Sequence, residues 1–271
     1  MNRAAAIFAT PWFHRRFTLA QDGQYTTVTE VADWARTPYD ELRKSLLLGA
    51  GGEAASSRVL LLAPARHGDG TTTAAVLFAA SLATNARVLL LELNFRRPSV
   101  AATLGLSEYT AVSDLLHAGN GNGKNGHANG HGNGHTNGQA NGQRNGHNGD
   151  PERAVMATEV ANLFVLPNQI NGAVRALPEV QAISEIVRKL RDKFDYIVID
   201  AAPVLGYPDT PLLATVADGV LLIVAADATP VESALAARRE VERSGASLLG
   251  AVVTRQRRFV PEFIARHLGD Q

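Results

Sequence analysis

Short apolar runs recur along this chain, and several of them end in a polar or acidic residue. They occupy residues Arg58–Ala63, Arg87–Glu92, Tyr196–Asp200, Gly219–Ala225 and Leu248–Thr254. Continuous apolar runs of this length are typical of strands that are buried on both faces, as in a parallel sheet. Helical stretches separate these runs, so the pattern predicts an α/β fold with a doubly wound, mostly parallel sheet. In such sheets, ligands bind beyond the carboxyl ends of the strands.

One helix, Tyr39–Leu48, is expected before the first strand. Further helical stretches span residues 72–84, 178–193 and 231–244. The chain has 271 residues, of which 45% are hydrophobic, and this is ample for one large packed core. We therefore expect a single domain over residues 37–271, preceded by an N-terminal extension of residues 1–36.

Residues 119–149 differ from the rest of the chain, because they consist of Asn-Gly repeats with interspersed His, Gln and Ala. Asn-Gly favours turns, and nothing in this segment can bury a core. We interpret it as a disordered insertion within the domain. His127, His131 and His135 are four residues apart, which would suit a metal site on a helix, but the glycine content argues against a helix here.

The composition narrows the classes of function. Basic and acidic residues balance at 26 each, so no overall field attracts nucleic acid or anionic lipid. The absence of cysteine excludes disulfides and thiolate metal sites and fits a cytoplasmic protein. No run approaches the roughly 18–20 apolar residues that span a bilayer. Contact with a membrane is therefore expected only through a partner.

A loop rich in glycine and threonine follows the first expected strand and leads directly into a helix. Its central residues are Gly68, Asp69, Gly70, Thr71, Thr72 and Thr73. A strand, such a loop and a helix N-terminus together form an anion site, because backbone N–H groups and the helix dipole converge on phosphate. A P-loop normally ends in Gly-Lys-Ser/Thr, in which lysine reaches the β- and γ-phosphates and the hydroxyl binds Mg²⁺. Here Thr71 stands in the lysine position, whereas Thr72 keeps the hydroxyl.

Two more expected strands end in candidate site residues. The second is followed by Glu92-Leu-Asn94-Phe-Arg96-Arg97-Pro98, and the third ends in Asp200-Ala-Ala-Pro203. An acidic residue at the end of a buried strand can reach Mg²⁺ in P-loop enzymes. We therefore expect Thr72 and Asp200 to form the metal site and Arg96 to contact the nucleotide. Simpler interpretations are a capping role for Asp200 and solvated charges at Arg96 and Arg97.

These three motifs, in this order, resemble the cytoplasmic domain of the bacterial tyrosine kinases that regulate capsule and exopolysaccharide synthesis. That family carries a phosphate loop of the type G-E-G-K-S-T, then hhh-D-x-D-x-R-R-P, then hhhh-D-T-P-P. The resemblance runs from about Tyr39 to the C-terminus and implies a P-loop NTPase fold of the MinD/ParA type. It also implies ATP or ADP and Mg²⁺ as ligands, bound weakly if at all, given the residues that differ.

The departures from the family pattern are as informative as the matches. Besides Thr71, Glu92 and Asn94 replace two aspartates that in the family serve metal binding and activation of the attacking hydroxyl. The family also has an E-x-x-R-x-x-R helix for ring assembly, and the matching residues here are Thr37, Asp40 and Arg43. The tyrosine cluster that family members phosphorylate on one another is missing, since no tyrosine follows Tyr207.

No other lysine is well placed to replace the missing one. Only Lys44, Lys124, Lys189 and Lys193 are present. The first precedes the sheet, the second lies in the Asn-Gly tract, and the last two precede the strand that ends in Asp200. Arg66 or Arg96 could reach the phosphates, although an arginine fork differs in shape from an ammonium.

The hypothesis is a pseudokinase-like regulator of exopolysaccharide or capsule biosynthesis, in which Asp200, Glu92 and Asn94 form a degenerate catalytic site. Its expected partner is a membrane polysaccharide co-polymerase, an active kinase homologue or another copy of itself. It would be cytoplasmic and reach the inner membrane only through that partner. The alternatives are a divergent active kinase or ATPase of polysaccharide export, and a MinD/ParA-type ATPase.

Overall fold

The computed structural model describes residues 7–8, 33–49, 58–119, 150–169, 179–226 and 228–255. The side chains of residues 7–8, 33–37, 47–49 and 117–119 are not described. Beyond Gly119, the Asn-Gly tract, which includes His127, His131, His135 and Lys124, lies outside the described residues. The same holds for the chain after Arg255.

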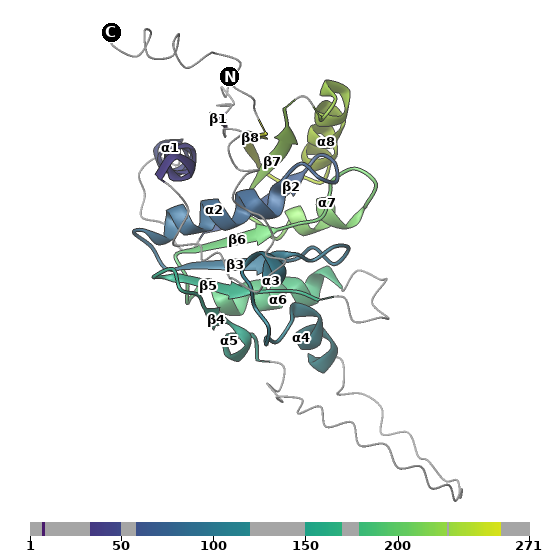
Figure 1. Cartoon of the computed structure of the whole chain (residues 1–271). Helices are drawn as coiled ribbons and strands as arrows, with labels where there is room; N and C mark the ends of the chain where they lie inside the picture. The colour runs from purple at the N-terminus through teal and green to yellow at the C-terminus, as the bar shows by residue number, and fades with distance from the viewer. Residues whose placement is uncertain are drawn as a thin grey trace, which may run out of the picture.

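An eight-stranded sheet forms the centre of the described part, in the order β1-β8-β7-β2-β6-β3-β5-β4 (Figure 1). The strands are β1 (Ile7–Phe8), β2 (Arg58–Pro64), β3 (Val88–Glu92), β4 (Met156–Ala157), β5 (Leu163–Leu166), β6 (Tyr196–Asp200), β7 (Gly219–Ala225) and β8 (Leu248–Thr254). All neighbouring pairs are parallel except β4 with β5. The predicted doubly wound, mostly parallel sheet is confirmed.

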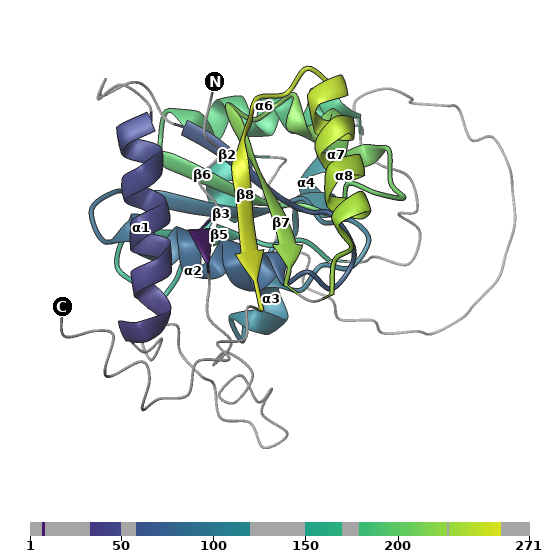
Figure 2. The same cartoon turned by 90° about the horizontal axis from the view of Figure 1, so that it is seen from above.

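Helices cover both faces of the sheet. They are α1 (Asp33–Gly49), α2 (Thr71–Ala83), α3 (Val100–Thr103), α4 (Val112–Gly119), α5 (Pro151–Ala154), α6 (Val180–Arg191), α7 (Asp209–Ala214) and α8 (Val231–Arg243). Figure 2 shows α2 and α6 on opposite sides of the central strands. None of the helices in the described part of the chain combines the length and the apolarity that a membrane span requires.

Each central strand contributes to two hydrophobic cores, because its side chains alternate between the faces of the sheet. In β2, Leu61 packs into the core beneath α6, α7 and α8, while Leu60 and Leu62 pack into the core beneath α1 and α2. Both sets are buried, which explains the unbroken apolar runs.

Helix α1 begins at Asp33, six residues before the expected start at Tyr39, and it packs against α2. Asp40 accepts a hydrogen bond from Ser81 Oγ of α2 at 2.5 Å, and Arg43 Nε lies 3.8 Å from the same carboxylate oxygen. Two of the positions that correspond to the family's ring-assembly helix therefore act within this domain. Residues 7–8, expected to lie in an N-terminal extension, pair with β8 as the edge of the sheet.

We expect the central strands to dominate stability. Leu61 is fully buried, whereas Leu235 of α8 is 47% exposed. Leu61→Ala should lower the free energy of unfolding by about 2–5 kcal/mol, since the cavity cannot fully collapse. Leu235→Ala, the matched control, should change it by no more than roughly 0.5 kcal/mol. Urea denaturation measures both, and equal losses would contradict this account of the core.

Candidate functional site

The candidate site lies at the carboxyl ends of three adjacent strands, β2, β6 and β3. Because these strands are parallel and in register, Leu62 and Glu92 both pair with Asp200. The segments that follow the three strands therefore meet at one edge of the sheet. The pattern of polar strand ends had predicted this convergence.

The loop between β2 and α2 has the backbone geometry of a phosphate cradle. Gly68 and Gly70 adopt φ values of +90° and +86°, a left-handed region that favours glycine. Gly70 is the N-cap of α2, which begins at Thr71 without a side-chain cap and without an acidic residue in its first turn. The first N–H groups of α2, from Thr71, Thr72 and Thr73, have no partner within the helix, so an anion is the natural acceptor.

Asp69 holds this loop in shape. Its carboxylate is buried and accepts hydrogen bonds from the Arg66 N–H at 2.8 Å and from Thr229 Oγ1 at 2.7 Å. Its carbonyl oxygen accepts a third from Thr254 Oγ1 at 2.5 Å. The loop is thereby tied to the end of β8 and to the segment between β7 and α8. Thr229 and Thr254 carry no motif and could not be found from the sequence.

Thr72 and Asp200 come together as expected. Thr72 Oγ1 donates a hydrogen bond to Asp200 Oδ2 at 2.7 Å and lies 3.0 Å from Ser99 Oγ. Asp200 is fully buried, and its Oδ1 has no hydrogen-bond partner in the described structure. A hydroxyl beside a carboxylate with a free oxygen fits Mg²⁺, which takes few protein ligands and completes its shell with water and phosphate. No cluster of three or more His, Cys, Asp or Glu side chains occurs within the described ranges.

Burial raises the pKa of Asp200 to about 8, with the neighbouring Glu92 carboxylate adding to the rise and the Thr72 hydrogen bond opposing it. Without a cation, Asp200 is therefore largely protonated at neutral pH. A bound divalent ion would favour the charged form. Binding of a divalent ion at this position would therefore release a proton.

Both carboxylate oxygens of Glu92 accept hydrogen bonds from backbone N–H groups. One carboxylate oxygen accepts from the N–H groups of Ser99 at 2.5 Å and Val100 at 3.0 Å, and the other accepts from the Asn168 N–H at 2.9 Å. The side chain is fully buried. Burial raises the pKa of Glu92, and the three backbone hydrogen bonds oppose that rise. Glu92 thus joins the start of α3 to the end of β5, and the sequence showed no sign of this role.

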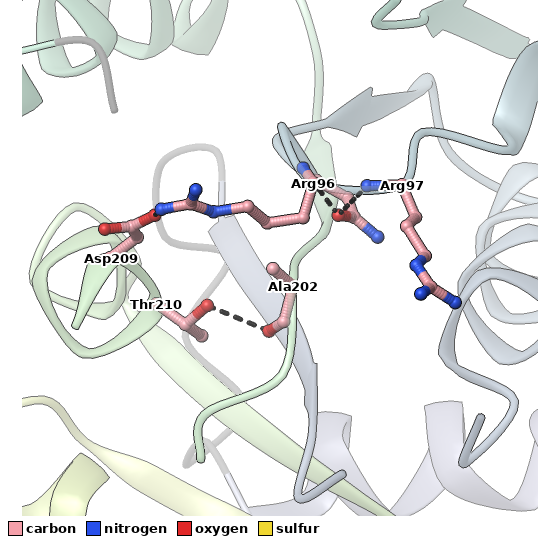
Figure 3. Close-up of polar contacts among 6 residues, drawn as sticks. Arg96, Arg97, Ala202, Asp209 and Thr210 are labelled. Carbon is pink, nitrogen blue, oxygen red and sulfur yellow. Dashed lines mark hydrogen bonds and ion pairs between the residues drawn. The ribbon is translucent and has the colours of Figure 1, made fainter. Parts of the chain in front are cut away.

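Asn94 likewise bonds to the local backbone. Its Oδ1 accepts from the N–H groups of Arg96 at 3.2 Å and Arg97 at 3.0 Å, and the two arginine side chains then leave in different directions (Figure 3). Arg96 forms an ion pair with Asp209 at 2.5 Å and lies over the Tyr207 ring, 5.0 Å from its centroid. The structure therefore places Arg96 beside α7 and not against the phosphate loop.

Thr71, in the lysine position, is buried, and its Oγ1 has no hydrogen-bond partner in the described structure. The described lysines lie elsewhere. Lys44 is on α1, Lys189 is in the last turn of α6, and Lys193 forms an ion pair with Glu152 at 3.4 Å. Lys189 and Lys193 precede β6 and so lie at the edge of the sheet opposite Asp200, as expected.

A family model described as an AAA domain matches residues 57–236, more than half of the chain. The chain belongs to the AAA domain family. The match includes the loop between β2 and α2, Glu92 and Asp200, so the candidate site lies within the matched range. Thr254, which donates a hydrogen bond to the Asp69 carbonyl of that loop, lies outside the matched range.

Relatives of this AAA domain include tyrosine kinases. Tyrosine-protein kinase CpsD of Streptococcus agalactiae is 26% identical over 109 residues, which cover 40% of this chain and 48% of that protein. The chain thus matches about half the length of this relative. The predicted resemblance to the bacterial tyrosine-kinase cytoplasmic domains is confirmed.

Solved structures share the fold. The kinase domain of Escherichia coli tyrosine kinase ETK matches with a TM-score of 0.72 at 16% identity, over 95% of this chain and 92% of that one. The septum site-determining protein MinD of Pyrococcus horikoshii, complexed with Mg-ADP, matches with a TM-score of 0.56 at 17% identity, over 79% of this chain and 78% of that one. The AAA domain described above therefore has the predicted P-loop fold.

The raised pKa of Asp200 predicts a pH dependence of stability. Its folded pKa of about 8 lies above the value of about 4 for an unfolded Asp, so the folded state holds a proton that the unfolded chain has lost between these values. The free energy of unfolding should therefore fall as the pH rises through this window. Asp200→Asn should remove most of that fall, as followed by urea denaturation across the window.

Asp192→Asn, at an exposed carboxylate after α6, is the matched control and should keep the slope of the wild type. An unchanged slope in Asp200→Asn would show that Asp200 titrates normally in the folded protein.

Proposed function

We propose that this protein is a pseudokinase-like regulator of exopolysaccharide or capsule biosynthesis, which binds nucleotide without transferring phosphate. Its place would be the cytoplasmic face of the inner membrane, on a polysaccharide co-polymerase or an active kinase homologue. Two observations support the family context: the order of the motifs and the resemblance to tyrosine-protein kinase CpsD. The site residues support the loss of catalysis.

The observation that carries the proposal is the side chain at the lysine position of the phosphate loop. Thr71 is buried there and bears no charge. Phosphoryl transfer depends on positioned charges that stabilise the transferring group. Removing one preorganised donor typically costs about 10²–10³ in rate. The other lysines of the described structure lie on α1, in the last turn of α6 and in an ion pair with Glu152, and none of them is in the loop between β2 and α2.

The hydrogen bonds of Glu92 and Asn94, the two residues expected to assist the chemistry, also support a loss of catalysis. Both carboxylate oxygens of Glu92 accept hydrogen bonds from backbone N–H groups, and the side-chain oxygen of Asn94 accepts two further backbone hydrogen bonds. Neither side chain is disposed to accept a proton from an attacking hydroxyl. A general base must lie within hydrogen-bond reach of the proton that it removes. These losses are not additive within one site, yet together they favour a very slow or inactive enzyme.

Nucleotide binding has better support than catalysis. The glycine backbone of the loop, the uncapped start of α2 and the Thr72–Asp200 pair are all retained. We infer that the loop amides would hold phosphate and that Thr72 and Asp200 would hold Mg²⁺. The likeness of the fold to that of MinD, a protein solved with Mg-ADP, supports the same pair of ligands here.

A second candidate is a divergent but active kinase or ATPase, in which an arginine does the work of the lysine. The intact Thr72–Asp200 contact is equally compatible with this alternative, because both interpretations place Mg²⁺ beside that buried carboxylate. A MinD/ParA-type ATPase is the third candidate, supported by the shared fold alone.

The test of the proposed function is phosphate transfer. Purified protein incubated with Mg²⁺ and labelled ATP should show neither tyrosine phosphorylation nor ATP hydrolysis above that of Asp200→Ala, because both need the missing charges. Phosphorylation or hydrolysis by the wild type that Asp200→Ala abolishes would refute the proposal and establish the active-kinase alternative.

Binding is tested separately by thermal unfolding. Mg²⁺ with ADP or ATP at 100 times Kd should stabilise the protein by about 2.7 kcal/mol. For a domain of this size that is an increase of several degrees in Tm. The shift should require Mg²⁺ and be lost in Asp200→Ala. Absence of a shift at millimolar nucleotide would leave a regulator that acts through protein contacts alone.

A further inference from the structure

We propose that Arg97, held against His67, supplies a positive charge for phosphate binding, although not for phosphate transfer, at the loop that lacks the usual lysine. The proposal rests on the nucleotide-binding part of the proposed function and names the side chain on which it depends. The ligand it would recognise is the phosphate chain of a nucleoside di- or triphosphate.

Arg97 is the arginine of the β3–α3 segment that contacts the phosphate loop. Its Nη1 lies 2.6 Å from Nε2 of His67, a residue of the loop between β2 and α2. Both side chains are exposed. The guanidinium therefore sits on the rim of the cradle formed by Gly68 and Gly70, although Arg97 is 26 positions beyond Thr71 in the sequence.

The direction of Arg97 follows from the turn that precedes it. Asn94 Oδ1 accepts the N–H groups of both arginines, and their side chains separate (Figure 3). Arg96 is drawn to Asp209 and has its charge largely balanced there. Arg97 extends the other way. The turn that Asn94 Oδ1 stabilises thus helps to bring a cation to the loop.

Arg97 is also better prepared than Arg66 for this task. Within the described structure, the Arg66 side chain is exposed and only its backbone N–H is held, by Asp69. Ordering a free arginine on a ligand costs side-chain entropy. The contact with His67 already restricts the Arg97 side chain, so less of its conformational entropy remains to be lost when a ligand binds. A guanidinium has five N–H donors, so one edge can stay on His67 while the other binds phosphate.

Buried groups without partners indicate that this end of α2 is built for a ligand. Thr71 Oγ1, in the first turn of α2, is buried and has no hydrogen-bond partner in the described structure. The same holds for Asp200 Oδ1, whose other oxygen already accepts from Thr72 of that turn. Buried polar atoms are rarely left unpaired unless something else completes them. Phosphate oxygens and a hydrated Mg²⁺ together would satisfy the hydroxyl and the carboxylate.

The test is isothermal titration calorimetry with Mg²⁺ and ADP, and with pyrophosphate, which carries the phosphate chain alone. Arg97→Gln should weaken both by roughly 10- to 100-fold, as expected for loss of a charged hydrogen bond to phosphate. Arg97→Lys, which keeps the charge, should lose less. Arg239→Gln, at an exposed arginine of α8, is the matched control and should bind as the wild type does.

Restoring the lysine gives the sharper test. If Arg97 substitutes for it, then Thr71→Lys should recover most of the affinity that Arg97→Gln removes, because either cation suffices. The Tm of each variant without ligand reports whether it is folded. Equal affinity in Arg97→Gln and the wild type would overturn the proposal, and so would a wild type that binds neither ligand. ATP turnover would instead contradict the proposed function and leave this assignment standing.

Discussion

Two buried carboxylates on neighbouring strands govern this site. Glu92 and Asp200 end β3 and β6 in direct register, and both are fully buried. Placing two such groups side by side in an apolar sheet is costly unless each is hydrogen-bonded or neutral. Glu92 meets this demand with three backbone N–H groups, and Asp200 with the Thr72 hydroxyl and a raised pKa. The arrangement of the surrounding loops follows from these requirements.

The different hydrogen bonding of Glu92 and Asp200 bears on function. Because Glu92 is saturated by the backbone, it acts as a structural anchor between α3 and β5. Asp200 keeps one oxygen free at the start of α2, next to Thr72. A site of this kind can hold a hydrated cation and phosphate but offers little to the chemistry of transfer. The pseudokinase proposal and the retention of a nucleotide cradle are therefore compatible.

Much of the fold could be predicted from the sequence. The bounds of β6, β7 and β8 agree with the expected runs, and α2 begins one residue earlier than expected. Burial on both faces makes β6 and β7 almost continuously apolar, so that the sequence reveals them clearly. The weaker elements had no such signal. The two residues of β1 at the edge of the sheet depend on pairing with β8, which is distant in sequence.

The candidate site also has features that the sequence predicts and features that it does not. The meeting of Thr72 with Asp200 was predictable, because neighbouring parallel strands end at one edge of the sheet. The separate directions of Arg96 and Arg97, the bonds of Asp69 to Thr229 and Thr254, and the capture of Glu92 by the backbone were not. The sequence by itself determined the sheet, the glycine- and threonine-rich loop after β2 and the threonine that stands where a P-loop normally has lysine, since these are set by local pattern. Only the tertiary structure decided which polar side chains remain free, because hydrogen-bond partners come from segments far apart in the chain.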